Sequence, residues 1–174
     1  VMALTRLGLN QAINLTSNVT GALPIANGGT NLTSGFVNGT TAVGKVLQVQ
    51  NQRLTTEFST TSGSYVDTGV TKSITPSAAT SKILVIYGSG MNYTSSGTEM
   101  AMNCMRDSTQ LNSVIINLDG VASTGGSAFM ILDEPSSTSS LTYKVQIKRN
   151  NGSGNCYVSV NNSLSTFTLM EIGA

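Results

Sequence analysis

The sequence predicts an all-β protein, an antiparallel β-sandwich of jelly-roll type preceded by an extended N-terminal segment. Two observations predict this fold class. The 174 residues are 39% hydrophobic but only 10% charged and 5% aromatic, with 18 Gly, a composition unlike that of helical proteins. From residue 45 onward, apolar and polar residues alternate with a period of two, which is typical of half-buried strands.

The alternation is clearest in residues 141–148, LTYKVQIK, where every second residue is apolar. Clusters of Gly, Ser, Asn and Asp separate this stretch from the other candidate strands. About ten short strands at near-regular spacing favour a sandwich or barrel. The candidates are residues 45–50, 54–59, 65–74, 82–87, 99–106, 113–118, 127–132, 141–148, 156–160 and 167–169.

The chain divides into an N-terminal segment, residues 1–44, and a sandwich domain, residues 45–174. The segment is rich in Asn, Thr and Gly, and its apolar residues are spaced singly. It cannot close a core alone, because about 1–2 kcal/mol of backbone entropy per residue opposes ordering. Two interpretations are open, a disordered tail and a thin stalk whose apolar residues meet their copies in sister chains. We favour the stalk.

Three candidate strands are apolar on both faces, which indicates that both faces lose contact with water. They contain residues 83–86 (ILVI), 114–116 (VII) and 129–132 (FMIL). One face can pack inside the sandwich, but the other needs a second cover. Because no helices are predicted to cover it, we expect an identical subunit to do so, and therefore a homo-oligomer.

Several functional classes are excluded. The chain has no His, which rules out Ser-His-Asp and Cys-His nucleophiles and His-bearing zinc sites. Nine basic and eight acidic residues give a net charge of +1, so bulk charge does not favour nucleic acid. The longest apolar runs, residues 83–87 and 128–132, have five residues each, against about 18 for a membrane span. We expect no cofactor, no metal, no nucleic acid and no membrane insertion.

Cys104 and Cys156 are too few for a disulfide framework or a structural metal site. Both stand in alternating segments, which favours a role as small buried hydrophobic residues. A single bridge between them is the alternative.

Residues 21–30, GALPIANGGT, resemble a recurrent shaft motif of bacteriophage tail-fibre proteins, G-T-L-P-[VI]-A-N-G-G-T-G. The chain departs from it at Ala22, where Thr is common, and at Asn31, where Gly is expected. The C-terminal region is similar to the distal domain that follows such shafts in marine and cyanobacterial phage fibres. The similar stretches are residues 74–77 (ITPS), 81–85 (SKILV), 106–109 (RDST), 132–135 (LDEP), 141–146 (LTYKVQ) and 169–172 (LMEI).

The resemblance implies a homotrimeric virion appendage that is made in the bacterial cytoplasm. Residues 1–44 would anchor it to other virion proteins, and the head would bind a receptor on the host surface, a glycan or a protein, of which we favour a glycan. A purely structural virion protein, such as a capsid decoration or a stalk component, is the alternative. The sequence does not decide between attachment to the tail and attachment to the capsid.

Two turn-rich loops are the candidate receptor-binding surface, since sugars are held by hydrogen bonds and by stacking on aromatic rings. Asn92 and Tyr93 belong to the first loop, and Asn150 and Asn151 to the second. No motif supports these four residues beyond their loop chemistry. Several weak sites on a trimer would add up to firm attachment.

Polysaccharide hydrolysis by paired carboxylates is a third and disfavoured function. Asp133 and Glu134 are adjacent and would point to opposite faces of a strand, so they cannot flank one glycosidic bond. A pair formed across subunits, such as Asp107 with Glu99, stays open. No long repeat typical of depolymerase solenoids is visible. We therefore expect no enzyme and assign no catalytic residue.

Overall fold

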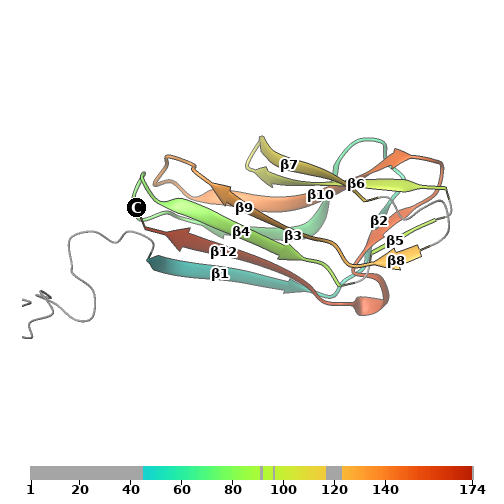
Figure 1. Cartoon of the computed structure of the whole chain (residues 1–174), viewed down its shortest axis with the longest axis horizontal. Coiled ribbons are helices and arrows are strands. Elements are labelled where there is room, and N and C mark those ends of the chain that lie inside the picture. The colour runs from blue at the N-terminus through green and yellow to red at the C-terminus, as the bar shows by residue number, and fades with distance from the viewer. Residues whose placement is uncertain (1–44, 91, 96, 117–122, 174) are drawn as a thin grey trace, which may run out of the picture. The chain divides into compact units, whose positions relative to one another are not determined.

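The computed structural model describes residues 45–90, 92–95, 97–116 and 123–173, and their regular structure is almost entirely β-sheet (Figure 1). The predicted stalk, residues 1–44, lies outside this part of the chain. One short 3-10 turn, Val160–Asn162, is the exception among the described residues. The prediction of an all-β domain is confirmed. The strands are β1 (Val46–Leu54), β2 (Phe58–Thr60), β3 (Val66–Ile74), β4 (Lys82–Gly88), β5 (Asn92–Thr94), β6 (Glu99–Arg106), β7 (Thr109–Ile116), β8 (Ser123–Gly125), β9 (Ala128–Asp133), β10 (Leu141–Asn151), β11 (Cys156–Val158) and β12 (Ser165–Ile172).

Eight of these strands form a jelly roll. The first sheet has the order β1-β12-β4-β9 and the second has the order β3-β10-β6-β7. All neighbouring strands in the two sheets are antiparallel. Except at the β6–β7 hairpin, each of these strands is followed along the chain by one in the other sheet. This is the arrangement of a double Greek-key sandwich, so the prediction of a jelly-roll-like sandwich is confirmed.

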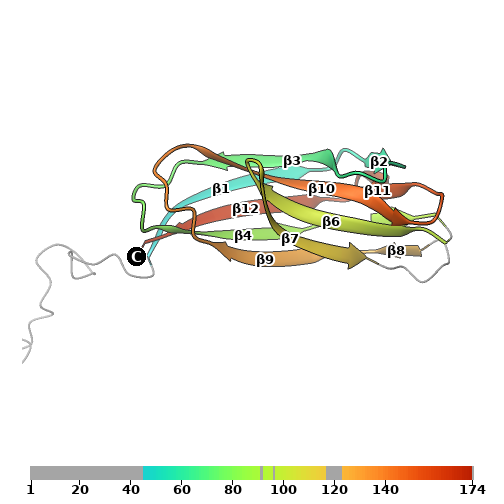
Figure 2. The ribbon, with the colours of Figure 1, turned by 90° about the horizontal axis from the view of Figure 1, so that it is seen from above.

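A third sheet closes one end of the sandwich. Its order is β2-β11-β5-β8, and each strand comes from a different connection between strands of the two main sheets. We call these four short strands and their loops the cap. Lys45 and Gly173 lie at the opposite end, where the Gly173 amide donates to the Lys45 carbonyl at 2.8 Å (Figure 2). The domain therefore has two distinct ends, one with both described chain ends and one with the cap.

The core lies between the two main sheets. In β10 the apolar residues predicted to face inward are all buried, and the polar residues between them are partly exposed. Aromatic rings from the first sheet fill the centre, where the ring centroids of Tyr87 and Phe129 are 5.1 Å apart. The fully buried core includes Val70, Ile83, Val85, Tyr87, Met100, Met102, Tyr143, Val145, Ile147, Phe167 and Leu169.

Some predicted elements were wrong in detail. Strands β5 and β8 were not predicted, because their sequences contain turn residues and become strands only by pairing with each other and with β11. Residues 54–59 were expected to be one strand, but Leu54 ends β1 and Phe58 begins β2. Residues 156–160 were also expected to be one strand, but β11 ends at Val158 because Ser159 has a positive φ of 56°.

None of the described residues belongs to a helix long and apolar enough to cross a membrane. Cys104 and Cys156 are both buried and unbonded to each other, which confirms their interpretation as small buried residues. Burial raises the pKa of the Cys104 thiol to about 12 and that of the Cys156 thiol to about 11. Both side chains are therefore neutral thiols at ordinary pH.

We predict that neither thiol of the native protein reacts readily with a disulfide reagent at pH 8, because only an exposed thiolate attacks. Labelling should be more than about 100-fold slower than in denaturant, since it requires local unfolding. The measurement is release of the coloured thiolate over time. Rapid labelling of one or both thiols in folded protein would contradict this burial.

Candidate functional site

The structure places the four predicted receptor-binding residues differently. Asn92 is fully buried, and its amide donates to the Ser127 hydroxyl at 2.6 Å, so its side chain contributes to packing beneath the cap. Tyr93 pairs through its backbone with Tyr157 in the cap. The Tyr93 side chain lies outside the described part of the structure. Asn150 and Asn151 are exposed at the end of β10.

The two predicted loops are brought together at the cap. The Asn150 amide donates to Glu99 Oε2 at 3.1 Å. The Ser95 amide donates to the Asn155 carbonyl at 3.1 Å, and the Gly154 amide donates to Thr98 Oγ1 at 2.9 Å. A surface shared by both loops is therefore available at the end opposite the chain ends.

Gly152 fits the close approach of these two loops. Its φ of +80° is a conformation that side chains disfavour, and a Cβ there would collide with the carbonyl of Gly97. Asn151 supports the same turn, because its side chain accepts a hydrogen bond from the Gly152 amide at 2.8 Å. The loop pair is thus a defined structure.

The basic cluster of the sequence lies on the outer face of the second sheet and at its end. Lys144 forms an ion pair with Asp67 at 3.0 Å, and Lys148 lies 5.0 Å from the centre of the Tyr65 ring. Hydrogen bonding from Gln146, and then Lys144, lowers the pKa of Asp67. Arg149 donates to the Ser153 carbonyl at 3.3 Å. These partners explain the cluster as a solvated sheet face.

The outer face of the first sheet is apolar. Val49, Met170, Leu84 and Leu132 stand directly opposite one another on the four strands and form one continuous row. The next row contains Ile86 and Met130, and the row on the other side contains Val46 and Ile172. We call these eight residues the outer apolar face. Met130 is 68% exposed, and Leu132 and Val46 are each 54% exposed.

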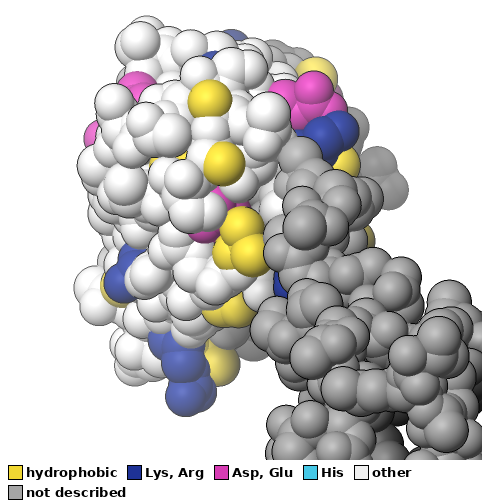
Figure 3. Space-filling view, turned by 90° about the vertical axis from the view of Figure 1, so that its left-hand side faces the viewer, with side chains coloured by type: hydrophobic (Ala, Val, Ile, Leu, Met, Phe, Trp, Pro, Cys, Tyr) yellow, Lys and Arg dark blue, Asp and Glu magenta, His cyan; other side chains and the backbone are white. Residues whose placement is uncertain are grey.

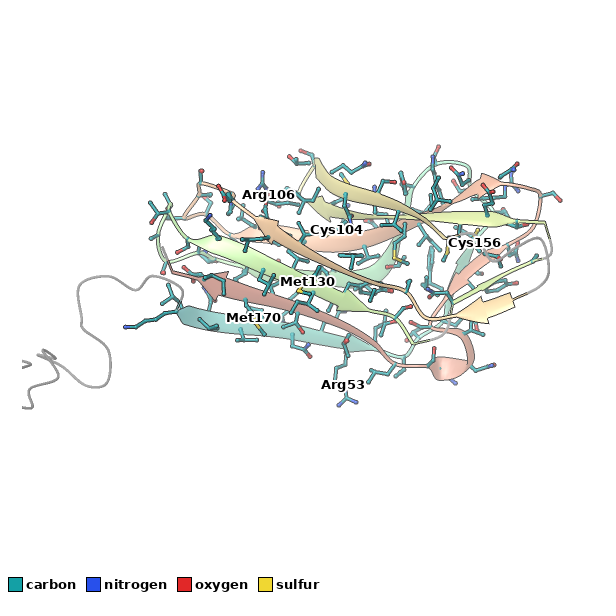
Figure 4. The ribbon with its side chains drawn as sticks, viewed as in Figure 1. Arg53, Cys104, Arg106, Met130, Cys156 and Met170 are labelled. Atoms are coloured by element: carbon teal, nitrogen blue, oxygen red, sulfur yellow. The ribbon has the colours of Figure 1, made fainter. Side chains whose placement is uncertain are left out.

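Two labelled side chains mark this face in Figure 4, Met130 on β9 and Met170 on β12. The alternate residues of β4, Ile83 and Val85, are fully buried in the core. The prediction of two apolar faces is therefore confirmed for β4 and β9, whose inner face is covered by the second sheet. In β7, Val114 and Ile115 are 42% and 58% exposed, so the expected burial on both faces is wrong for that strand within the single chain. What covers the outer face remains a prediction.

The carboxylates considered for hydrolysis have structural partners. Asp133 is 8% exposed, and Arg106 Nη1 donates to both of its oxygens at 2.7 and 2.8 Å. The Tyr143 hydroxyl donates to the same carboxylate at 2.6 Å, and burial followed by this contact raises the pKa of Tyr143. Glu134 is exposed and pairs with Lys82 at 2.6 Å, so the two acids do point in different directions. The Arg106–Asp133–Tyr143 group links the two main sheets.

Glu171 is a buried acid that the sequence pattern did not single out. It is fully buried, and it accepts hydrogen bonds from Gln48 Nε2 at 2.6 Å and from the amide and hydroxyl of Ser77 at 2.7 and 2.6 Å. Burial alone would raise the pKa of Glu171, but the bonds from Ser77 and Gln48 outweigh it and lower this pKa to about 2. The sequence signal that could have predicted its burial is its inward position in the alternation of β12.

A polar groove of about 440 Å³ lies between β1 and β3. Next to the groove, Gln52 joins the two strands, donating to the Gly69 carbonyl at 3.2 Å and accepting from the Thr71 amide at 2.7 Å. Lys72 stands at an inward position of β3, between buried Val70 and Ile74. A strand edge pairs less readily with another chain when a side chain occupies its free backbone groups, as Gln52 does here. An inward-pointing charged residue such as Lys72 has the same effect. We interpret the groove as protection of the β3 edge.

Among the residues that the structure describes, no three His, Cys, Asp or Glu side chains gather in a way that could hold a metal ion.

Charged side chains are sparse and of both signs on the end that carries Lys45 and Gly173 (Figure 3).

No family model matches the chain, and no curated protein matches its sequence. Solved structures similar to it include three of one virus. The VP2 subviral particle of infectious bursal disease virus is 13% identical with a TM-score of 0.36, the Gx strain of that virus 15% with 0.37, and the Gt strain 14% with 0.30. Each match covers 74% of this chain but only 34–37% of the other, so the chain spans about a third of their length. Likenesses this distant assign no family or function.

We predict that Glu171→Gln lowers the free energy of unfolding by about 2–3 kcal/mol at pH 7, because the carboxylate accepts charge-assisted bonds. The folded pKa of about 2 lies below the usual 4.5, so this stabilisation is complete above pH 4.5 and is lost as the pH falls toward 2. The difference in unfolding free energy between wild type and variant should therefore become smaller as the pH falls from 4.5 to 2. Chemical denaturation at several pH values measures it.

Glu57→Gln is the matched control, because Glu57 is exposed. Its unfolding free energy should follow that of the wild type at every pH. A Glu171→Gln difference that stays constant from pH 7 to pH 2 would contradict the depressed pKa.

Proposed function

We propose that this chain is a structural protein of a viral particle, in which residues 45–174 form a jelly-roll head and residues 1–44 connect it to other virion proteins. The observation that carries the proposal is that the two ends of the domain differ. Both described chain ends lie at one end, and the four short strands of the cap pair with one another at the other end. A domain built this way is displayed with its cap outward when it is held by its N-terminal segment.

The finer proposal is a homotrimeric appendage of a phage virion, of the tail-fibre kind. It is supported by residues 21–30, whose sequence resembles a fibre shaft motif and precedes the head in the expected order. Asp133 and Glu134, the adjacent acids, serve ion pairs in the head, which favours a role without catalysis. Synthesis in the cytoplasm of a bacterial host follows from this proposal.

Antibodies raised against the loop of residues 150–155 should label intact, purified particles, because the cap faces outward in the proposed arrangement. Electron microscopy with gold-labelled antibody measures this. Antibodies against residues 141–147 of β10, whose apolar side chains are buried in the core, are the control and should label only denatured particles. Absence of the chain from purified particles would contradict a virion role.

Binding of a host surface receptor, preferably a glycan, is the second candidate function. The favouring observation is that the two loops selected from the sequence meet at the cap through the contacts of Asn150, Ser95 and Gly154. Exposed amides and hydroxyls on a defined loop pair suit hydrogen bonding to sugars. Three copies would strengthen a weak contact by multivalency.

If the cap binds a receptor, excess purified protein should reduce adsorption of the phage to host cells at least fivefold, an effect of about this size being ordinary for competition at saturating ligand. The double variant Asn150→Ala/Asn151→Ala should compete much less well, because it removes exposed amides from the cap. Counting unadsorbed phage measures the effect.

Thr138→Ala/Ser139→Ala is the matched control, since both residues are exposed in the connection between β9 and β10, away from the cap. It should compete like the wild type. Unchanged adsorption in the presence of excess wild-type protein would contradict receptor binding and leave the structural role.

A further inference from the structure

The two main sheets have outer faces of opposite character. On β10, in the middle of the second sheet, the outward residues are Thr142, Lys144, Gln146 and Lys148, and Asp67 pairs with two of them. On β4 and β12, in the middle of the first sheet, the outward residues include Leu84, Ile86, Met170 and Ile172. A solvated face has the first composition, and a face that is covered has the second.

We propose that the outer apolar face of the first sheet is the surface by which copies of this chain bind one another. This inference rests on the homo-oligomer of the proposed function and names the surface that forms it. The apolar rows run across all four strands, so the contact is a packing of sheet against sheet rather than an extension of a strand edge. In a trimer, the three copies turn this face toward a common axis, so that each face packs against both of its neighbours.

The size of the face fits this partner. Full burial of a Val, Leu, Ile or Met side chain removes roughly 60–120 Å² of apolar surface. Four of the eight side chains are 51–68% exposed and the other four are partly buried, which gives on the order of 150–450 Å² of apolar surface. A stable interface buries about 800 Å² on each partner, and about 65% of the area in its buried core is apolar. The face therefore supplies a large part of the apolar centre of one standard interface.

Electrostatics favours a second copy over a charged partner. The border of the face carries Lys82 and Glu134, which neutralise each other at 2.6 Å, and Arg53, which points away from the sandwich in Figure 4. The border also includes uncharged Asn51 and Thr168, which hydrogen-bond to each other at 2.7 Å. Identical chains can approach across such a nearly neutral surface without repulsion.

Light scattering on the full chain at micromolar concentration tests the proposal. Leu132→Glu and Met130→Glu each place a charge in the face, and both residues are exposed enough in the single chain to tolerate it. We expect the wild type to have the mass of three chains and each variant a threefold lower mass. Circular dichroism identifies variants that fail to fold, and Met130→Gln, which adds no charge, replaces any that do.

Val114→Glu is the matched control, because Val114 is an apolar residue of β7, 42% exposed, outside the face. It should keep the wild-type mass. Folded Leu132→Glu and Met130→Glu proteins with the wild-type mass, or a Val114→Glu protein that alone dissociates, would overturn the choice of face while leaving the oligomer and the virion role intact. A monomeric wild type would overturn both the face and the homo-oligomer, and particle labelling would still test the virion role separately.

Discussion

A sheet whose strands are apolar on both faces has to be covered twice, and this constraint organises the whole molecule. The first sheet meets it once within the chain, where Ile83, Val85 and Leu169 pack against the second sheet and are fully buried. Its other face, represented by Met130 and Leu132, has no cover from the described residues of the same chain. The second sheet has less need of a cover, because the outward residues of β3 and β10 are polar. The domain is thus asymmetric, and its asymmetry predicts where its copies meet.

The polar interior complements the apolar core. Asp133 joins Arg106 on β6 and Tyr143 on β10, so one carboxylate connects strands from both sheets. Glu171 on β12 links β1 and the connection after β3, because it accepts hydrogen bonds from Gln48 and Ser77. Buried acids with several donors are costly to leave unpaired, so these groups fix the register in which the sheets close. The stretches that resemble phage fibre heads contain these acids and several of their partners, and in this structure those residues serve architecture.

The sequence alone predicts much of the sandwich, because alternation with a period of two assigns faces directly. It identified the inward residues of β10 and the two-sided character of β4 and β9. It could not reveal which distant groups converge on one buried atom. Ser77 and Gln48 are 94 and 123 residues from Glu171 in the chain, and no local pattern marks them as its donors.

The candidate site was predicted only in part for the same reason. The composition of the loops around Asn92 and Asn150 indicated exposed turns, and the structure does place these loops together. Asn92 itself is buried, because the segment pairs with β8 and β11 and turns the side chain toward Ser127. Tertiary pairing of short strands overrides local turn preference at such positions.

The most direct measurement for the covered face is the rate at which individual methionines are oxidised in the intact protein. Met130 is 68% exposed in the single chain, whereas Met105 lies partly buried on the other sheet and serves as an internal reference. If copies of the chain cover the first sheet, Met130 will be oxidised more slowly than Met105, and denaturation will abolish the difference. Oxidation of Met130 in the native protein as fast as in the denatured chain would show that this face stays open to water and would contradict the account.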